Sequence, residues 1–170
     1  ITEADLIVLA APLGVTRQLF QELKPILSEK TVVTDVGSVK SGVVDDAREQ
    51  LGSLFGRFVP GHPIAGSEAK GPKAAFADLF LNHHVLLTPA PETDPSAVEL
   101  VKKMWRAAGA RVTLLSHSGH DQNLALTSHL PHVLAYVLMN LVHNKDSLEE
   151  LVSMMGGGFR DTTRIASSDP

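Results

Sequence analysis

One histidine in this sequence has neighbours that suit acid–base chemistry. His62 follows a short apolar run and lies in the stretch Gly-His-Pro-Ile-Ala-Gly-Ser-Glu at residues 61–68. Proline stiffens the backbone after the histidine, and glycine allows the backbone to approach a ligand closely. An unperturbed imidazole titrates near pH ~6.5 and can therefore accept a proton at neutral pH. We predict that His62 is a general base, with a strand-end histidine that performs no chemistry as the alternative.

Two further segments could bind charged or polar groups. Gly37 and Ser38 follow a strand-like run and precede a helical pattern, so the N–H groups of the helix start could bind an anion or the polar edge of a cofactor. Taken alone, this pattern favours Ser38 as the N-cap of that helix. Further along, Arg160 and Arg164 follow three glycines and could bind a carboxylate through paired hydrogen bonds. A flexible turn followed by a helix with surface arginines is the alternative.

The eight histidines raise the question of a metal site. His117 and His120 are three residues apart, a spacing that places two imidazoles on one face of a helix. The same spacing recurs at His129 and His132, but Pro131 disturbs the regular geometry between them. No glutamate stands where a metalloprotease motif needs one. We therefore predict no metal site.

The elements that must position these residues alternate between strand and helix. Short aliphatic runs predict five strands, at residues 6–10, 31–36, 57–59, 85–88 and 111–115. Apolar residues at helical spacing predict helices at residues 16–27, 39–54 and 95–108. This alternation indicates parallel βαβ units in a doubly wound α/β sheet, whose functional residues lie at the carboxyl ends of the strands. We expect those ends to meet along one edge, at residues 11–14, 35–38 and 61–63.

The pattern changes near residue 116. Residues 118–142 show no strand signal, and their apolar residues recur at helical spacing, with Pro131 predicting a kink or a break. We predict the C-terminal part of an α/β domain at residues 1–116 and the first part of an all-helical domain at residues 117–170. The chain starts without Met inside a strand pattern and ends without a closed helix, so we expect both ends to be truncated.

The composition excludes several classes of protein. A net charge of −4 provides no basic face for nucleic acid or an anionic membrane surface. The absence of cysteine excludes a disulfide framework, a thiolate metal site and a cysteine nucleophile, and it fits a reducing compartment. No apolar run approaches the ~18 residues of a membrane span, and the first residues lack the basic start of a signal peptide. We expect a cytoplasmic protein that binds neither nucleic acid nor membrane.

Five segments, taken together and in order, resemble the prephenate/arogenate (cyclohexadienyl) dehydrogenase family of tyrosine biosynthesis. They are Asp-Leu-Ile-Val-Leu-Ala-Ala-Pro at residues 5–12, Thr-Asp-Val-Gly-Ser-Val-Lys at 34–40, Gly-His-Pro-Ile-Ala-Gly-Ser-Glu at 61–68, Ser-His-Leu-Pro-His at 128–132 and Gly-Gly-Phe-Arg-Asp-Thr-Thr-Arg-Ile-Ala at 157–166. The resemblance implies a Rossmann-type nicotinamide dinucleotide-binding domain and a helical dimerisation domain. It also implies that the glycine-rich pyrophosphate-binding turn of the family precedes residue 1.

The resemblance implies an enzyme that converts prephenate to 4-hydroxyphenylpyruvate by oxidative decarboxylation, as a homodimer, with hydride transfer to NAD or NADP and with NAD favoured. His62 would accept the hydroxyl proton of the substrate with support from Ser38, and Arg164 would bind a substrate carboxylate. Other matching positions are implied to line the substrate pocket or its entrance, at His129, His132, Glu68 and Asp161. A last group is implied to lie along the cofactor, at Ala11, Pro12, Gly37 and Ser38.

Three alternatives remain. The substrate could be arogenate, or both compounds, although a hydrogen-bond-donating His132 suits the keto acid of prephenate better than the amino acid of arogenate. A β-hydroxyacid dehydrogenase would share the strand order but needs a lysine in the helical domain, and none lies between Lys103 and Lys145. A non-catalytic binding module of the same fold is disfavoured because the residues implied in catalysis are all present.

Overall fold

The computed structural model describes residues 3–66 and 75–167. They form two compact units. The first unit contains the described residues up to Gly66 and those of Phe76–Asp121, and the second contains Ala75 and the described residues from Gln122 onward. The domain boundary near residue 116 stays a prediction, and the first unit extends to Asp121.

Three parallel strands form one sheet of the first unit. They are β1 (Leu6–Leu9), β2 (Val32–Asp35) and β3 (Phe58–Val59), and they lie in that order. All three coincide with predicted strands, and β-branched and aromatic side chains of the kind that they contain suit a pleated surface. β2 is buried along its whole length, as expected for a strand that is covered on both faces. The prediction of parallel βαβ units is confirmed here.

A second sheet contains a strand that the sequence did not predict. β4 (Gly61–Ile64), β5 (His84–Leu87) and β6 (Arg111–Leu114) lie in that order, with β5 and β6 parallel but β4 antiparallel to β5. The expectation that residues 61–63 form a loop after a strand end is therefore wrong. Glycine and proline disguise the strand, and Pro63 is tolerated because β4 lies at the edge of this sheet.

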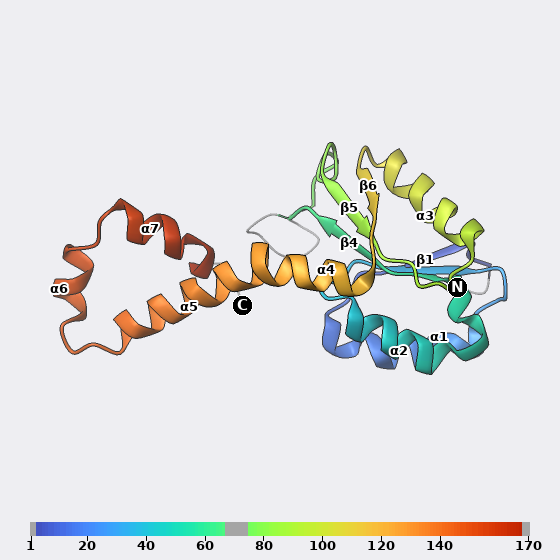
Figure 1. Cartoon of the computed structure of the whole chain (residues 1–170), viewed down its shortest axis with the longest axis horizontal. Helices are drawn as coiled ribbons and strands as arrows, with labels where there is room; N and C mark the ends of the chain where they lie inside the picture. The colour runs from blue at the N-terminus through green and yellow to red at the C-terminus, as the bar shows by residue number, and fades with distance from the viewer. Residues whose placement is uncertain (1–2, 67–74, 168–170) are drawn as a thin grey trace. The chain divides into compact units, whose positions relative to one another are not determined.

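Helices cover both sides of the first unit. α1 (Thr16–Leu23) and α2 (Ser41–Leu51) lie together on one side, and α3 (Pro95–Ala107) lies on the other (Figure 1). α1 and α2 each pass into a 3-10 helix, at Lys24–Ile26 and at Gly52–Arg57. Both predicted helices thus end in a tighter turn. This arrangement confirms a doubly wound α/β unit.

The start and the end of α3 follow the predicted signals. Asp94 is the N-cap, and its carboxylate accepts a hydrogen bond from the Ser96 N–H at 2.7 Å. Pro95 occupies the first helical position, where its missing N–H needs no partner. Gly109 follows the helix with a φ of 80°, a left-handed conformation that glycine adopts without strain.

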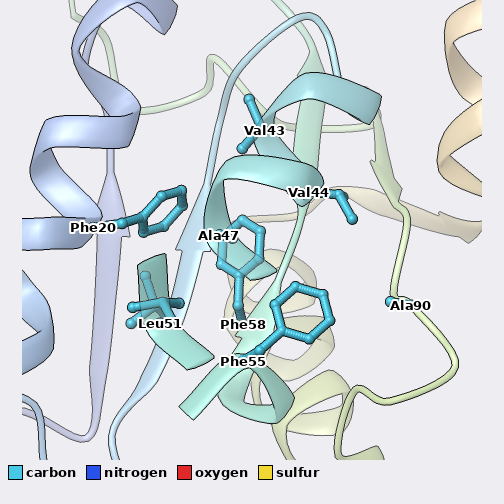
Figure 2. Packing of buried hydrophobic residues seen from close by; sticks show 9 residues of the cluster. Phe20, Val43, Val44, Ala47, Leu51, Phe55, Phe58 and Ala90 are labelled. Carbon is cyan, nitrogen blue, oxygen red and sulfur yellow. The ribbon is translucent and has the colours of Figure 1, made fainter. Parts of the chain in front are cut away.

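Two hydrophobic cores lie on opposite faces of the sheets. Val33 packs with α1 and α2, whereas its neighbour Val32 packs with α3, because successive side chains of a strand point to opposite faces. In the first core the rings of Phe20 and Phe58 meet edge to face at 5.1 Å (Figure 2). The second core holds Val59, Val85, Leu87, Ala97, Val98, Val101 and Trp105. Val32 and Val33 thus anchor β2 in both cores, one on each face of the strand.

The long helical stretch contains an irregular turn before its proline. α4 (His117–Leu124) leads into a π-helical turn at Ala125–His129, which leads into α5 (Leu130–His143). Pro131 lacks the N–H that would bond the preceding turn, and a π turn accommodates such a mismatch. The backbone therefore stays helical through Pro131, and the break that was one of the two predicted outcomes does not occur.

The second unit packs short helices against α5. α6 (Leu148–Ser153) and α7 (Gly157–Thr163) follow in sequence, and a 3-10 helix (Arg164–Ser167) closes the described chain. α5 contacts α6, α7 and the 3-10 helix. The three glycines precede and begin α7, in agreement with a turn followed by a helix.

α5 exposes much of its apolar surface. Its exposed side chains are Leu130, Val133, Leu134, Tyr136, Val137, Met139 and Leu141. By length and composition alone, the continuous helical stretch His117–His143 is sufficient to cross a membrane. The sequence had led us to expect no such segment. One such helix is weak evidence for a membrane span, because buried core helices pass the same test, but here only 6% of the apolar window is buried, and an exposed apolar surface of this kind is typical of protein or membrane contacts.

Candidate active site

His62 lies in a cavity of the first unit with mostly apolar walls. The cavity has a volume of about 460 Å³ and is lined by Val8, Ala10, Val36, His62, Pro63, Ala65, Leu79, Phe80 and Trp105. These residues come from β1 and the segment after it, from the end of β2, from β4 and the segment after it, from the turn before β5 and from α3. The cavity therefore includes residues from two of the segments that were predicted to meet at one edge, Val36 and His62 with Pro63, and His62 is the titratable side chain among its lining residues.

A buried histidine stands behind His62. The Nδ1 atom of His62 lies 2.9 Å from the Nε2 atom of His120, within hydrogen-bond distance. On its other side, the Nδ1 atom of His120 lies 2.8 Å from Oδ1 of Asp121. His120 is 0% exposed, so its two ring nitrogens depend on these partners. Hydrogen bonds thus connect three side chains in series, from Asp121 through His120 to His62.

Asp121 also caps α2 from a distant part of the chain. Its Oδ1 accepts the N–H of Lys40 at 2.8 Å and its Oδ2 accepts the N–H of Ser41 at 2.7 Å. Partial burial acts to raise the pKa of this carboxyl. The hydrogen bonds from Ser41, from the Lys40 backbone and from His120 prevail and hold the pKa well below its ordinary value. Asp121 therefore stays an anion at the positive end of α2.

This cap corrects the prediction for Ser38. α2 begins at Ser41 rather than at residue 39, and its N-cap position is Lys40. Ser38 is exposed and lies in the segment between β2 and α2, so it is not the N-cap. The N–H groups that we expected to bind an anion or a cofactor edge are bound by Asp121 instead. Ser38 thus remains available for the role beside the substrate that the resemblance implies.

A buried ion pair connects this segment to β4. The ammonium of Lys40 contacts the carboxylate of Asp35, with side chains 0% and 4% exposed, and also donates to the carbonyl oxygen of Gly61 at 2.8 Å. Asp35 in turn accepts the N–H of Gly37 at 2.9 Å and the N–H of Gly61 at 3.1 Å. The pair therefore sets the backbone immediately before His62.

The two glycines at this point are required by packing. A Cβ atom on Gly37 would lie 2.6 Å from Cδ2 of Leu13 and 2.9 Å from the Asp35 carboxylate. A Cβ atom on Gly61 would lie 2.9 Å from the backbone oxygen of Asp35. Such short contacts force the neighbouring atoms to move. Glycine thus allows the strand ends to approach closely.

The other described residues that were predicted for the site are distributed over both units. Ala11 and Pro12 follow β1 in the first unit, after Ala10. His129, His132, Asp161 and Arg164 belong to the second unit, where α5 packs against the elements that carry Asp161 and Arg164. The ring of His132 donates from Nδ1 to the Ser128 carbonyl oxygen at 2.8 Å. Glu68 lies outside the described residues.

Four residues that organise this site were not predicted from the sequence. They are Asp35, Lys40, His120 and Asp121. The sequence pattern presented His120 only as one of two histidines that could bind a metal. Among the described residues, no group of three histidine or acidic side chains could hold a metal ion. An adjacent histidine and aspartate just after the last predicted strand was the available signal, but their partners are 58 to 81 residues away.

Comparison with known proteins agrees with this geometry. Residues 1–114 match the family model described as prephenate dehydrogenase, nucleotide-binding domain, and residues 116–170 match that described as prephenate dehydrogenase, dimerization domain. The chain is 40% identical to the cyclohexadienyl dehydrogenase of Zymomonas mobilis and 40% identical to the prephenate dehydrogenase of Bacillus subtilis. Each alignment covers 100% of this chain, but 58% and 46% of the two relatives, so the chain spans about half of their length.

Solved structures lead to the same family. The prephenate dehydrogenase of Aquifex aeolicus, in complex with hydroxyphenyl propionate and NAD⁺, is 41% identical with a TM-score of 0.89, over 98% of this chain and 57% of that one. The arogenate dehydrogenase of Synechocystis is 31% identical with a TM-score of 0.83, over 99% of this chain and 60% of that one. This chain belongs to the prephenate dehydrogenase family.

Proposed function

We propose that the whole protein oxidatively decarboxylates prephenate to 4-hydroxyphenylpyruvate in tyrosine biosynthesis, with NAD or NADP as hydride acceptor. The observation that carries this proposal is His62, which lines a mostly apolar cavity and is backed by His120 and Asp121. A histidine held in this way suits general base catalysis. The named activities of the relatives support the same reaction.

The walls of the cavity fit the flat ring of a nicotinamide. Ala10, Val36 and Pro63 provide apolar surface, and His62 is the titratable group among them. We propose that four residues just beyond the carboxyl ends of β1 and β2 lie along the cofactor, namely Ala11, Pro12, Gly37 and Ser38. When bound, the nicotinamide supplies the acceptor for the hydride. NAD is favoured, because the Aquifex relative was solved with NAD⁺.

The residues of this chain would divide the remaining tasks. His62 takes the proton from the ring hydroxyl of prephenate while a hydride leaves the ring carbon that bears this hydroxyl. Loss of carbon dioxide then makes the ring aromatic. Ser38 supports His62 beside the substrate, and Arg164 binds a substrate carboxylate through charged hydrogen bonds. We assign the pocket and its entrance to His129, His132, Asp161 and Glu68. General base catalysis of this kind contributes roughly 10²–10⁴-fold to the rate.

A second candidate substrate is arogenate. The arogenate dehydrogenase of Synechocystis is 31% identical, and the relative from Zymomonas mobilis is a cyclohexadienyl dehydrogenase. In this chain the His132 ring donates from Nδ1 to the Ser128 carbonyl, so Nε2 of the neutral ring carries a lone pair and would accept a hydrogen bond from the ammonium of arogenate. Prephenate stays the favoured substrate because the relatives from Bacillus subtilis and Aquifex aeolicus are prephenate dehydrogenases.

We also propose a cytoplasmic homodimer that forms through the helical domain. The exposed apolar side chains of α5 supply a surface of the kind that dimers bury. The match of residues 116–170 to a dimerization domain supports this assignment. Light scattering of the full-length protein should give twice the monomer mass, and a monomer at micromolar concentration would contradict it.

A cofactor-reduction assay on the full-length protein tests the proposed function. Prephenate and arogenate are each supplied with NAD and with NADP, and formation of the reduced cofactor is followed by absorbance. We expect the highest kcat/KM for prephenate with NAD. A preference for arogenate would select the second candidate, and no turnover in any of the four combinations would overturn the proposal.

A further inference from the structure

A continuous series of hydrogen bonds connects the start of α2 to His62. The backbone N–H groups of Lys40 and Ser41 bind the carboxylate of Asp121, which binds Nδ1 of His120, whose Nε2 binds Nδ1 of His62. The four contacts measure between 2.7 and 2.9 Å. All of these residues belong to the first compact unit.

The chemistry of the partners orders the protons along this series. An ionised carboxylate only accepts hydrogen bonds, so the Nδ1 atom of His120 must carry a hydrogen. In a neutral ring, Nε2 of His120 then has a lone pair and accepts the Nδ1–H of His62. The lone pair of neutral His62 therefore lies on Nε2. The hydrogen bonds from α2 stabilise the anionic form of Asp121 and so keep this order.

We propose that His120 and Asp121 are positioning residues, which hold His62 in the tautomer that accepts a proton at Nε2 and stabilise the imidazolium that results. This inference rests on the proposed dehydrogenase function. In the step, the O–H bond of the substrate breaks and an N–H bond forms at Nε2 of His62. The Nδ1–H of His62 stays in its hydrogen bond to His120, and Asp121 takes up no proton. The negative charge of Asp121 faces the new positive charge through one imidazole.

The other charged groups near His62 leave this assignment intact. Asp35 and Lys40 face the backbone of Gly61 as an ion pair with no net charge. His83 contacts the carbonyl oxygen of Ile64, two residues along β4. Among the described residues of this series, Asp121 therefore carries the negative charge that stabilises a protonated His62, and this charge acts through the His120 ring.

Two variants of the full-length protein separate the charge from the hydrogen bond. Asp121→Asn can keep an oxygen toward His120 and removes the charge. His120→Gln places an amide oxygen near the former Nε2 and can still accept from His62, whereas His120→Leu cannot. His117→Gln is the matched control, because His117 begins the same helix and no role in the series is assigned to it.

Steady-state kinetics with prephenate and NAD across pH provide the first readout. The acidic limb of kcat/KM reports the protonation of His62, and loss of the Asp121 charge makes the imidazolium less stable. We expect Asp121→Asn to move this limb about one pH unit lower, because an opposite charge shifts a neighbouring pKa by roughly 1–3 units at close range and by less when a group intervenes. We expect kcat to fall about 10²-fold in His120→Leu and to recover about 10-fold in His120→Gln, with KM nearly constant.

Nuclear magnetic resonance of ¹⁵N-labelled imidazoles provides a readout without turnover. In the wild type, His62 should carry its hydrogen on Nδ1 and titrate at higher pH than in Asp121→Asn, while His117→Gln should leave it unchanged. A His62 hydrogen on Nε2, an acidic limb that does not move, or equal activities of the Gln and Leu variants would each overturn the proposal. If the wild type turned over none of the substrates, the proposed function would fail. The tautomer and the titration of His62 would still test separately whether His120 and Asp121 hold its hydrogen on Nδ1.

Discussion

Replacement of Lys40 by methionine removes the cation of the buried ion pair and little else. Methionine is an unbranched, flexible and apolar side chain, so it fills most of the space that the lysine stem occupied. Asp35 would keep its hydrogen bonds from Gly37 and Gly61 but would lose its positively charged partner. The carbonyl oxygen of Gly61 would also lose a donor at 2.8 Å.

The burial of the pair sets the size of the effect. The side chains of Lys40 and Asp35 are 0% and 4% exposed, so water cannot replace the lost ammonium. Removal of one partner from a buried pair destabilises a protein by about 3–5 kcal/mol. Two backbone donors still stabilise the carboxylate, so we expect the lower part of that range, about 3–4 kcal/mol. Typical domains have a free energy of unfolding of about 5–15 kcal/mol, so the variant should fold with much reduced stability.

Urea unfolding followed by the fluorescence of Trp105 measures this loss. Trp105 is the single tryptophan of the sequence and is buried in the second core of the first unit, so it reports on the unit that holds the pair. The matched control is Lys102→Met, which removes an ion pair to the exposed carboxylate of Glu99 and should change stability by at most about 1 kcal/mol. A loss below about 1 kcal/mol for Lys40→Met, or a loss equal to that of the control, would refute the argument.

Four further predictions follow from the site and its frame. His62→Asn should lower kcat by about 10²-fold or more with little change in cofactor affinity, and near-normal turnover would remove His62 from its role. Arg164→Ala should mainly raise KM, because a charged hydrogen bond contributes about 1.5–3 kcal/mol, and an unchanged KM would exclude carboxylate binding. Gly61→Ala should destabilise the first unit by about 1–3 kcal/mol, because its Cβ would lie 2.9 Å from a backbone oxygen. The control Gly42→Ala has open space in α2 and should stabilise the unit by about 0.5–1 kcal/mol. Thermal unfolding measures both effects, and equal melting temperatures of the two variants would contradict the packing argument. The pKa of Asp121 is depressed in the folded state, so the contribution of its charge to stability is complete above the ordinary value of 3.8 and is lost as the pH falls below it. The difference in free energy of unfolding between the wild type and Asp121→Asn, measured with urea, should therefore narrow below that pH. A difference that stays constant with pH would argue against the cap.

Local signals were sufficient for most of the first unit. β-branched runs identified β1 and β2, and Asp94 with Pro95 identified the start of α3, because each signal acts through neighbours in the chain. The start of α2 was misjudged for the opposite reason. Ser38 has the residue type of an N-cap, but Asp121 competes for the same N–H groups from 81 residues away. A rule based on neighbours in the sequence cannot include a carboxylate that lies so far along the chain.

The strand that carries His62 was hidden in a similar way. Gly61 and Pro63 have the composition of a loop, and only pairing with β5 makes this segment a strand. The edge position of β4 tolerates the proline, and the close approach of Asp35 requires the glycine. Strand formation here depends on the partner strand rather than on the intrinsic preference of the residues.

The sequence by itself determined the class of fold, the family and the identity of the candidate base, because periodicity and ordered motifs are properties of the chain. The tertiary structure alone decided what surrounds that base. His120, Asp121 and the Asp35–Lys40 pair are polar groups withdrawn from water, and such groups must find partners wherever packing brings them. Those partners lie tens of residues apart, so the same histidine acquired its support from the fold rather than from its neighbours in sequence.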